Sequence, residues 1–241
     1  MTLACDLHMH SCLSPCGDND MTPANIAGMA SLKGLGAAAL TDHNTSKNCP
    51  AFFKACERMG ILPIAGMEMT TAEDIHVIAL FPDLEKAMAF DRYVDSRRIR
   101  IKNRPDIFGE QRIMDEFDKV LGEEPDLLIN ALSMDLEEAT AKAREYGALA
   151  YPAHIDKDAN GIIATLGFIP ENPKYSCFEF HDRKNAGPYR EKYRLGNAKF
   201  VFSSDAHYLW DIAEGEEAMR VECPEEASAD GKRRAILEAF L

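Results

Sequence analysis

The sequence has no long apolar run, no internal repeat and no low-complexity tract. Without an apolar stretch of about 20 residues, no membrane-spanning helix is expected. The first ten residues, MTLACDLHMH, become charged and histidine-rich at once, which leaves no room for the apolar core of a targeting signal. These absences predict a cytoplasmic protein without a membrane partner.

Basic residues are scarce relative to acidic ones. The chain has 27 Lys and Arg against 40 Asp and Glu, and its formal net charge is -13. Because phosphate backbones are usually met by lysine and arginine, we expect no long nucleic acid as a partner. A small phosphorylated substrate is still compatible with this charge, since bound metal ions supply positive charge that the formal count omits.

The cysteine pattern excludes a disulfide framework and a closed structural zinc finger. The chain has seven cysteines, an odd number, and no second close-spaced pair accompanies Cys12 and Cys16. We therefore expect free thiols in a reducing compartment. Hydrophobic residues make up 46% of the chain, which suffices for a core without covalent staples.

Short apolar runs alternate with amphipathic segments along most of the chain. Strands are predicted over residues 4–10, 37–40, 61–66, 75–81, 148–152, 176–180 and 199–202. Helices are predicted over residues 23–33, 51–59, 136–146 and 230–241. This alternation favours an α/β barrel, in which the carboxyl ends of parallel strands meet on one face. Residues 84–145 are expected to form a mainly helical insertion.

Histidine and acidic residues gather where the predicted strands end. His8 and His10 are two apart, so on an extended segment both point to the same side. Asp205 and His207 repeat that spacing. Imidazole and carboxylate ligands together suit zinc, manganese or iron better than calcium or magnesium. The pattern predicts a metal centre at the carboxyl ends of the strands.

Six segments resemble the motifs of the PHP (polymerase and histidinol phosphatase) superfamily, in the family's order. They are DLHMHS at 6–11, TDHN at 41–44, GMEMT at 66–70, the strand with His76, PAH at 152–154 and SSDAH at 203–207. The resemblance implies a distorted seven-stranded, TIM-like (β/α)7 barrel. It also implies one catalytic domain over residues 1–241 and two or three divalent ions of zinc, manganese or iron.

The resemblance also implies a ligand set for three metal positions. The first would use His8, His10, Glu68 and Asp205, and the second would share Glu68 and add His76 and His154. The third would use His43, His207 and a residue of the loop SCLSPCGDNDMTP. Asp18 is the expected loop ligand because it lies five residues before Pro23. The extra residues Pro15, Cys16 and Gly17 leave Asp20 and Cys16 as alternatives.

The expected chemistry is hydrolysis of a phosphoester by a hydroxide that bridges two metal ions, without a separate catalytic side chain. Candidate substrate-binding residues follow strand ends: Lys157, His181, Arg183 and Lys184. The basic segment 96–104 is interpreted as solvated surface, with a phosphate-binding element as the alternative. The expected substrate is a nucleotide or a sugar phosphate. The alternatives are a nuclease acting on short oligonucleotides and a non-catalytic metal-binding structural or interaction module.

Overall fold

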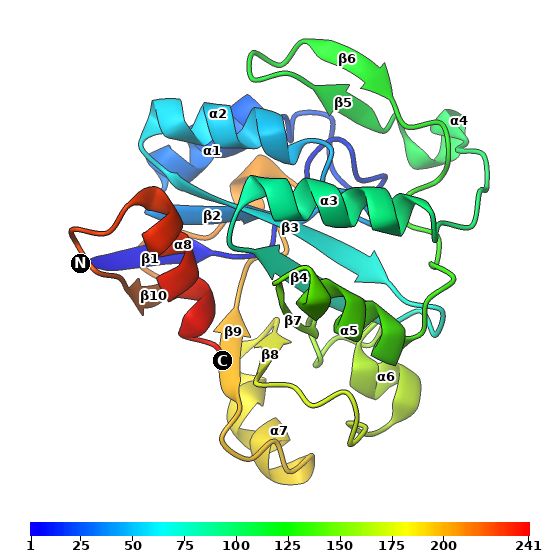
Figure 1. Ribbon diagram of the computed structural model, residues 1–241, viewed down its shortest axis with the longest axis vertical. Coiled ribbons are helices and arrows are strands. Elements are labelled where there is room, and N and C mark those ends of the chain that lie inside the picture. Colours follow the sequence, from blue (N-terminus) through cyan, green and yellow to red (C-terminus); the bar gives the residue numbers. More distant parts are fainter.

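Six strands form a curled sheet in the computed structural model, which describes residues 1–241 (Figure 1). In spatial order they are β10 (Met219–Glu222), β1 (Thr2–Asp6), β2 (Ala37–Leu40), β3 (Leu62–Thr70), β4 (His76–Phe81) and β7 (Leu149–Pro152). Strands β1, β2 and β3 are parallel, whereas β10 is antiparallel to β1. Strand β4 is antiparallel to both of its neighbours.

A second, two-stranded sheet continues the curl of the first. Its strands β8 (Cys177–Phe180) and β9 (Lys199–Phe202) are parallel. The backbone N–H of Ile155, just after β7, donates to the carbonyl of Glu179 at 2.9 Å. The N–H of His10, after β1, donates to the carbonyl of Ala206, after β9, at 3.0 Å. Seven strands thus form the wall of a distorted α/β barrel, as predicted. Strand β10 extends the sheet beyond this wall.

The direction of β4 decides where its histidine lies. Because β4 runs against β3, its first residue His76 pairs with Thr70, the last residue of β3. On the other side Val77 pairs with Pro152, the last residue of β7. A histidine at the start of β4 therefore reaches the same barrel edge as residues at the ends of the parallel strands.

Successive residues of each strand contribute to two separate hydrophobic clusters. The inner cluster takes residues such as Ile64, Ile78 and Tyr151 from different strands. Their neighbours in sequence pack outward against the helices. Because side chains alternate along a strand, Glu68 faces the barrel interior like Ile64. Gly66 lies between them, where an added Cβ would come within 2.8 Å of Leu80 Cδ2.

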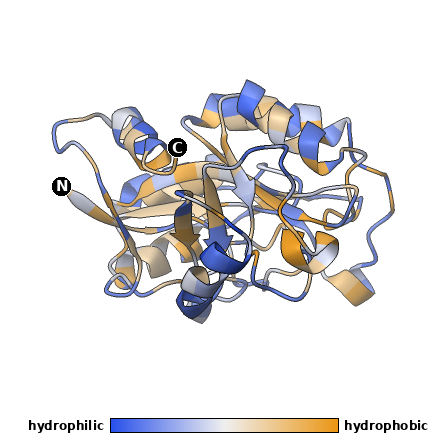
Figure 2. Ribbon diagram, turned by 90° about the horizontal axis from the view of Figure 1, so that it is seen from below, coloured by the Kyte–Doolittle hydropathy of each residue, from blue (hydrophilic) through white to orange (hydrophobic).

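Eight helices lie around the sheet, and Figure 2 shows that hydrophilic and hydrophobic residues mix along their ribbons. They are α1 (Pro23–Leu32), α2 (Cys49–Met59), α3 (Leu84–Asp95), α4 (Pro105–Phe108), α5 (Leu136–Glu145), α6 (Ile162–Leu166), α7 (Ala186–Lys192) and α8 (Ala229–Glu238). Thr22 caps α1, and its hydroxyl accepts the N–H of Asn25 at 3.3 Å. None of these helices has the length and apolar character to cross a bilayer.

The middle of segment 84–145 differs from the expected helical insertion. Helices α3 and α5 flank it, but strands β5 (Arg112–Met114) and β6 (Val120–Glu123) form an antiparallel hairpin at its centre. The turn explains the difference. The carboxylate of Asp115 accepts the N–H groups of Phe117 and Lys119, and Asp118 adopts a positive φ of 62°. These local bonds favour a turn over a continued helix.

Candidate metal centre

The carboxylate of Glu68 lies among five histidine side chains at the carboxyl edge of the barrel. Glu68 is 1% exposed. Its Oε1 lies 2.9 Å from His76 Nδ1, 3.2 Å from His154 Nε2 and 3.5 Å from His8 Nε2. Its Oε2 lies 3.2 Å from His10 Nε2 and 3.3 Å from His43 Nδ1. The structure therefore places Glu68 where a bridging ligand is expected.

One group of donor atoms has the residues of the first set expected from the sequence, and another shares two residues, Glu68 and His76, with the second set. In the first group, atoms of His8, His10, Glu68 and Asp205 all lie within 4.8 Å of one another. Asp205 Oδ1 is 3.2 Å from the Nε2 atom of each histidine of this group. The second group contains His43, Glu68 and His76 under the same limit. His154 joins this side of the cluster through its contact with Glu68.

The third expected set is only partly assembled. The ring of His207 stacks on that of His10 with 4.5 Å between centroids. Asp18, however, belongs to none of the donor groups, and its carboxylate accepts the N–H of Asp20 at 2.9 Å. Instead, the thiol of Cys16 lies with His10 and His43, with the donor atoms within 4.8 Å of one another.

Two buried acidic residues that the sequence analysis did not single out orient the first histidines. Glu179 Oε2 lies 2.9 Å from His8 Nδ1 and accepts the backbone N–H of His154 at 3.1 Å. The hydroxyl of Ser14 donates to Asp42 at 2.8 Å and so accepts from His10 Nδ1 at 3.1 Å. Both contacts leave Nε2 facing the cluster, a common arrangement around metal-binding histidines. In the sequence, Glu179 could have been noticed as the one acidic residue within the apolar segment CFEF, residues 177–180.

Backbone strain marks two of the strand ends. His154 has a φ of 24° and Asp205 a φ of 52°, in the region that side chains other than glycine rarely adopt. Such conformations cost about 1–3 kcal/mol each and occur where surrounding contacts impose them. At His154 the bond from its N–H to Glu179 is one such contact. Near Asp205, the Asp6 carboxylate accepts the N–H of Ser204 at 3.0 Å.

The electrostatic environment favours positive charge. Burial raises the pKa of Glu68, but His76 and His8 outweigh it and hold the pKa well below its ordinary value. Burial lowers the pKa of His10, but hydrogen bonds with Asp205 and Glu68 outweigh it and raise the pKa to about 9. Burial is the main reason that the pKa of His207 falls to about 4. The carboxylates of Glu68 and Asp205 thus stabilise positive charge on His10, at a place where metal cations could bind.

The donor atoms fit divalent metal ions. Several buried atoms of the proposed ligands make no hydrogen bond of good geometry, although carboxylate oxygens or ring nitrogens lie near three of them: His43 Nδ1, His76 Nδ1, His154 Nδ1 and Asp205 Oδ1. Buried polar atoms are nearly always partnered, so atoms left without partners in one cluster indicate a missing ligand. Coordination would partner His43 Nδ1, His76 Nδ1 and Asp205 Oδ1, whereas His154 faces Glu68 with its Nε2 atom. The combination of imidazole and carboxylate suits zinc, manganese or iron.

Of the four expected substrate-binding residues, only Lys157 lies at this centre. Its Nζ is 2.5 Å from Asp205 Oδ2. His181 and Arg183 instead line a separate cavity of about 280 Å³. There Arg183 donates to the carbonyl of Glu217 at 2.9 Å and lies over the ring of Phe202. The side chain of Lys184 is exposed to solvent.

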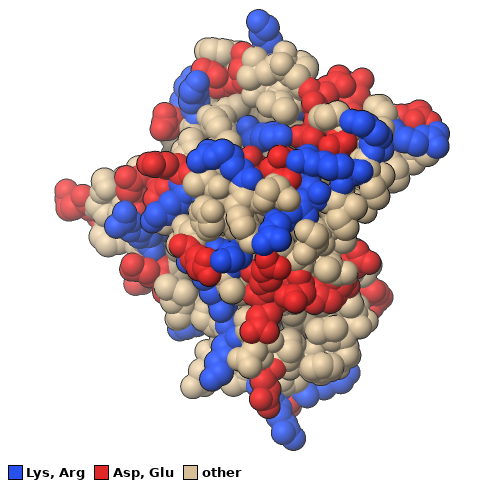
Figure 3. All heavy atoms as spheres, turned by 45° about the vertical axis from the view of Figure 1, so that its right-hand side comes forward, with Lys and Arg blue, Asp and Glu red and all other residues tan.

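The basic segment 96–104 is neutralised by nearby acidic residues. Arg100 pairs with Asp95 at 2.7 Å, and Lys102 pairs with Asp126 at 3.2 Å. Basic and acidic side chains are interspersed on the face shown in Figure 3. These pairs agree with the interpretation of the segment as solvated surface.

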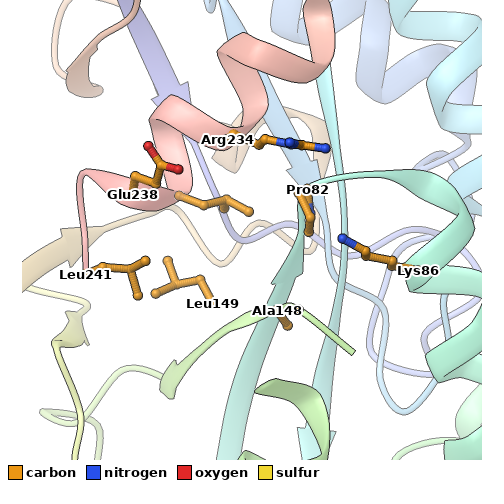
Figure 4. Close-up of a pocket in the computed structure, with 9 residues that line it drawn as sticks. Pro82, Lys86, Ala148, Leu149, Arg234, Glu238 and Leu241 are labelled. Atoms are coloured by element: carbon orange, nitrogen blue, oxygen red, sulfur yellow. The ribbon is translucent and has the colours of Figure 1, made fainter. Parts of the chain in front are cut away.

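A further cavity lies at the opposite edge of the barrel from the metal centre. It has a volume of about 270 Å³ and is lined by residues such as Pro82, Lys86, Leu149 and Arg234 (Figure 4). Pro82 follows the end of antiparallel β4, and Leu149 begins β7, so both lie away from His76. None of the three donor groups contributes to this cavity.

Solved structures share this fold. The lesion-specific endonuclease PfuEndoQ of Pyrococcus furiosus matches 100% of this chain at 20% identity, with a TM-score of 0.64. This chain spans only 56% of that protein. A putative metal-dependent phosphoesterase of Bifidobacterium adolescentis matches 98% of this chain and 96% of its own at 17% identity, with a TM-score of 0.54. A comparison with curated protein sequences finds no match.

One expectation about partners is wrong. Endonuclease Q has been solved with a 27-mer duplex that carries an abasic lesion at its active site, and this fold matches it with a TM-score of 0.64. Long nucleic acid is therefore not excluded for a chain of this fold. The net charge misled because it sums paired acids such as Asp95 with buried acids such as Glu68, and it omits metal ions.

Sequence comparison agrees with the structural likeness. The sequence profile of the PHP domain matches residues 6–166. That range begins at the last residue of β1, includes strands β2 to β7 and the residues from His8 to His154, and covers more than half of the chain. The strand-end histidines, the shared carboxylate of Glu68 and the distorted barrel all accord with this match. The chain belongs to the PHP domain family.

Proposed function

We propose that the protein is a metal-dependent phosphoesterase that hydrolyses a small phosphorylated molecule, such as a nucleotide or a sugar phosphate. The observation that carries the proposal is the Glu68 carboxylate among five histidines, with Asp205 beside them. The proposed ligands are His8, His10, His43, Glu68, His76, His154, Asp205 and His207. Two or three ions of zinc, manganese or iron would bind there within a single domain, residues 1–241.

Bound ions would activate water and neutralise phosphoryl oxygens. The chain's own residues would orient the ligands and the substrate. Glu179 and Ser14 hold the rings of His8 and His10 with Nε2 facing inward. Lys157 is the cation nearest to the ligands, and we assign it to a phosphoryl oxygen of the substrate.

The extent of the likenesses supports a small substrate. The Bifidobacterium phosphoesterase is matched over 96% of its length, so nearly all of it has a counterpart in this chain. Endonuclease Q has a large part without a counterpart here. The chain's seven cysteines are all free, which supports the proposal of a reducing, cytoplasmic setting.

Hydrolysis of a phosphodiester in nucleic acid is a second candidate, because two aromatic rings directly follow a proposed ligand. After His207, the rings of Tyr208 and Trp210 stack with 4.8 Å between centroids and 13° between planes. Tyr208 is 40% exposed and Trp210 is 70% exposed. Exposed aromatic rings of this kind are suited to stacking on nucleobases.

The decisive experiment is a substrate screen with the metal-loaded protein and a Glu68→Gln variant. The panel should contain nucleotides, sugar phosphates, single-stranded oligonucleotides and a duplex with an abasic site. We expect hydrolysis of one class, reduced at least about 100-fold by Glu68→Gln. Glu57→Gln, on an exposed part of α2, is the matched control.

Two outcomes would overturn this proposal. Turnover that survives in Glu68→Gln would place the chemistry elsewhere. Absence of turnover on the whole panel, together with a thermal stability that falls on chelation, would favour a non-catalytic metal-binding module.

A further inference from the structure

The thiol of Cys16 lies where the third metal position is expected. Its sulfur, a nitrogen of His10 and a nitrogen of His43 all lie within 4.8 Å of one another. His43 is 2% exposed, and its Nδ1 has no hydrogen-bond partner. Donors around a tetrahedral zinc ion are separated by about 3.6 Å, given bonds of about 2.0–2.3 Å. The Cys16 sulfur and the His43 nitrogen therefore need only a small closing movement to hold one ion.

The loop that carries Cys16 is tightly built. The N–H of Ser14 donates to the carbonyl of Ser11 at 3.0 Å, and the N–H of Gly17 donates to that of Ser14 at 2.9 Å. A Cβ on Gly17 would lie 2.2 Å from the Ser11 carbonyl oxygen, so only glycine fits there. The turn formed by Pro15, Cys16 and Gly17 thus fixes the path of the backbone beside the cluster.

Asp18 has a different role in the same loop. Its backbone N–H donates to the carbonyl of His207 at 2.9 Å, and its carboxylate accepts the N–H of Asp20. The backbone bond connects the loop to the segment after β9. The side-chain bond holds the Asp18 carboxylate within the turn formed by residues 18–20. The side chain of Asp18 consequently stabilises the loop that presents Cys16.

We propose that Cys16 is a thiolate ligand of the third metal position, together with His43. This inference rests on the proposed metal dependence and names a ligand and a metal class for it. On binding, the S–H bond breaks, the proton passes to solvent and a metal–sulfur bond forms.

His10 is shared between two groups, but its Nε2 can bind only one ion. The Nδ1 atom of His10 contacts the Ser14 hydroxyl, so Nε2 is the atom that can bind metal. Because this Nε2 lies beside Asp205, we assign it to the first metal position. His207 is then the remaining imidazole for the third position. Its Nδ1 lies 2.7 Å from the Asp205 carbonyl oxygen, which leaves Nε2 available.

A thiolate at this position has a consequence for metal choice. Soft sulfur ligands favour zinc or ferrous iron, whereas magnesium and calcium require oxygen. The third position is therefore expected to take zinc or iron from a mixture that also contains magnesium. The other two positions, built from imidazole and carboxylate, are expected to accept manganese as well.

The test is the absorption spectrum of the full chain loaded with cobalt(II), combined with elemental analysis of the zinc-loaded protein. A thiolate bound to cobalt gives an intense charge-transfer band in the near ultraviolet. We expect this band in the natural protein, its loss in Cys16→Ser and the loss of one zinc ion per chain. Asp18→Asn and Cys12→Ser are the matched controls and are expected to keep both the band and the zinc content.

A third variant separates ligation from folding. Cys16→Asp supplies an oxygen ligand, so it is expected to restore the zinc content without restoring the band. A band that persists in Cys16→Ser, or a zinc ion lost in Asp18→Asn but kept in Cys16→Ser, would overturn the inference. None of these readouts needs turnover, so an inactive protein that shows the band would contradict the proposed function alone.

Discussion

Glu179 Oε2 lies 2.9 Å from His8 Nδ1 and also accepts the backbone N–H of His154. One carboxylate thus holds a proposed ligand of the first metal position and the strained backbone of a ligand of the second. Because it accepts from Nδ1, it leaves Nε2 of His8 free to bind metal. We propose that Glu179 is a positioning residue that links the two proposed metal positions.

Replacement of Glu179 by glutamine should weaken metal binding about 10–100-fold. The amide keeps the size of the side chain but lacks the charge that makes the His8 imidazole a stronger donor. Competition with a zinc chelator measures the affinity. Glu171→Gln, at an exposed position, is the control. Equal affinities for the two variants would show that Glu179 has only a packing role.

Replacement of Lys157 by alanine should lower kcat/KM about 10-fold or more, because a charged hydrogen bond to a phosphoryl oxygen is lost. Steady-state kinetics on the substrate found in the screen measures the effect. Lys184→Ala removes an exposed lysine of the region that follows β8 and should change nothing. A similar loss in both variants would indicate a general effect of charge rather than contact at the site.

Replacement of both Tyr208 and Trp210 by alanine separates the two substrate candidates. If nucleic acid binds, its affinity should fall by about 1–3 kcal/mol for each stacked base. Fluorescence anisotropy with a labelled oligonucleotide measures this loss. Phe117→Ala, which removes a ring 74% exposed at the β5–β6 turn, is the control. Unchanged oligonucleotide binding in the double variant would argue against the second candidate.

The ion pairs of segment 96–104 should contribute to stability in a pH-dependent way. Although burial opposes it, Arg100 lowers the pKa of Asp95 below its ordinary value. The pair therefore stabilises the fold above the unfolded pKa of about 3.9, and its contribution is lost as pH falls through the lower folded value.

Asp95→Asn should accordingly cost less than about 1 kcal/mol at pH 7, as is usual for exposed pairs. The difference from the natural protein should shrink at low pH, as pH falls through the lowered pKa of Asp95, because the protonated aspartic acid is as uncharged as asparagine. Urea denaturation at the two pH values measures it. A difference that persists at low pH would mean that the ion pair is not its source.

The sequence predicted the barrel and most of the clustered residues because their signals are local. Apolar runs that end in histidine or acid mark strands such as β2 and the residues after them, and this local pattern places His43 near Glu68. The direction of β4 is not local, since it depends on pairing with β3 and β7. His76 was expected at the site from the family resemblance, and the strand pairing gives the physical reason why it lies beside Glu68.

Other features depend on distances that a linear pattern does not contain. Glu179 contacts His8 across 171 positions of the chain. The choice between Cys16 and Asp18 depends on how one loop folds against Ser11, and the sequence left that choice open. His181 and Arg183 follow β8 as expected, but the region after the strand directs them to another cavity.

The closure of the barrel between β9 and the residues after β1 has a consequence for biosynthesis. Leu7 N–H donates to the hydroxyl of Ser203, which lies 196 positions later, and Met9 forms a bridge with Ala206. His8 and His10 leave the ribosome early but meet Asp205 only after nearly the whole polypeptide has emerged. Contacts between such distant segments form slowly. The proposed first metal position is therefore complete only after residue 205 has emerged, and nascent chains that stall earlier would expose His8 and His10 without Asp205.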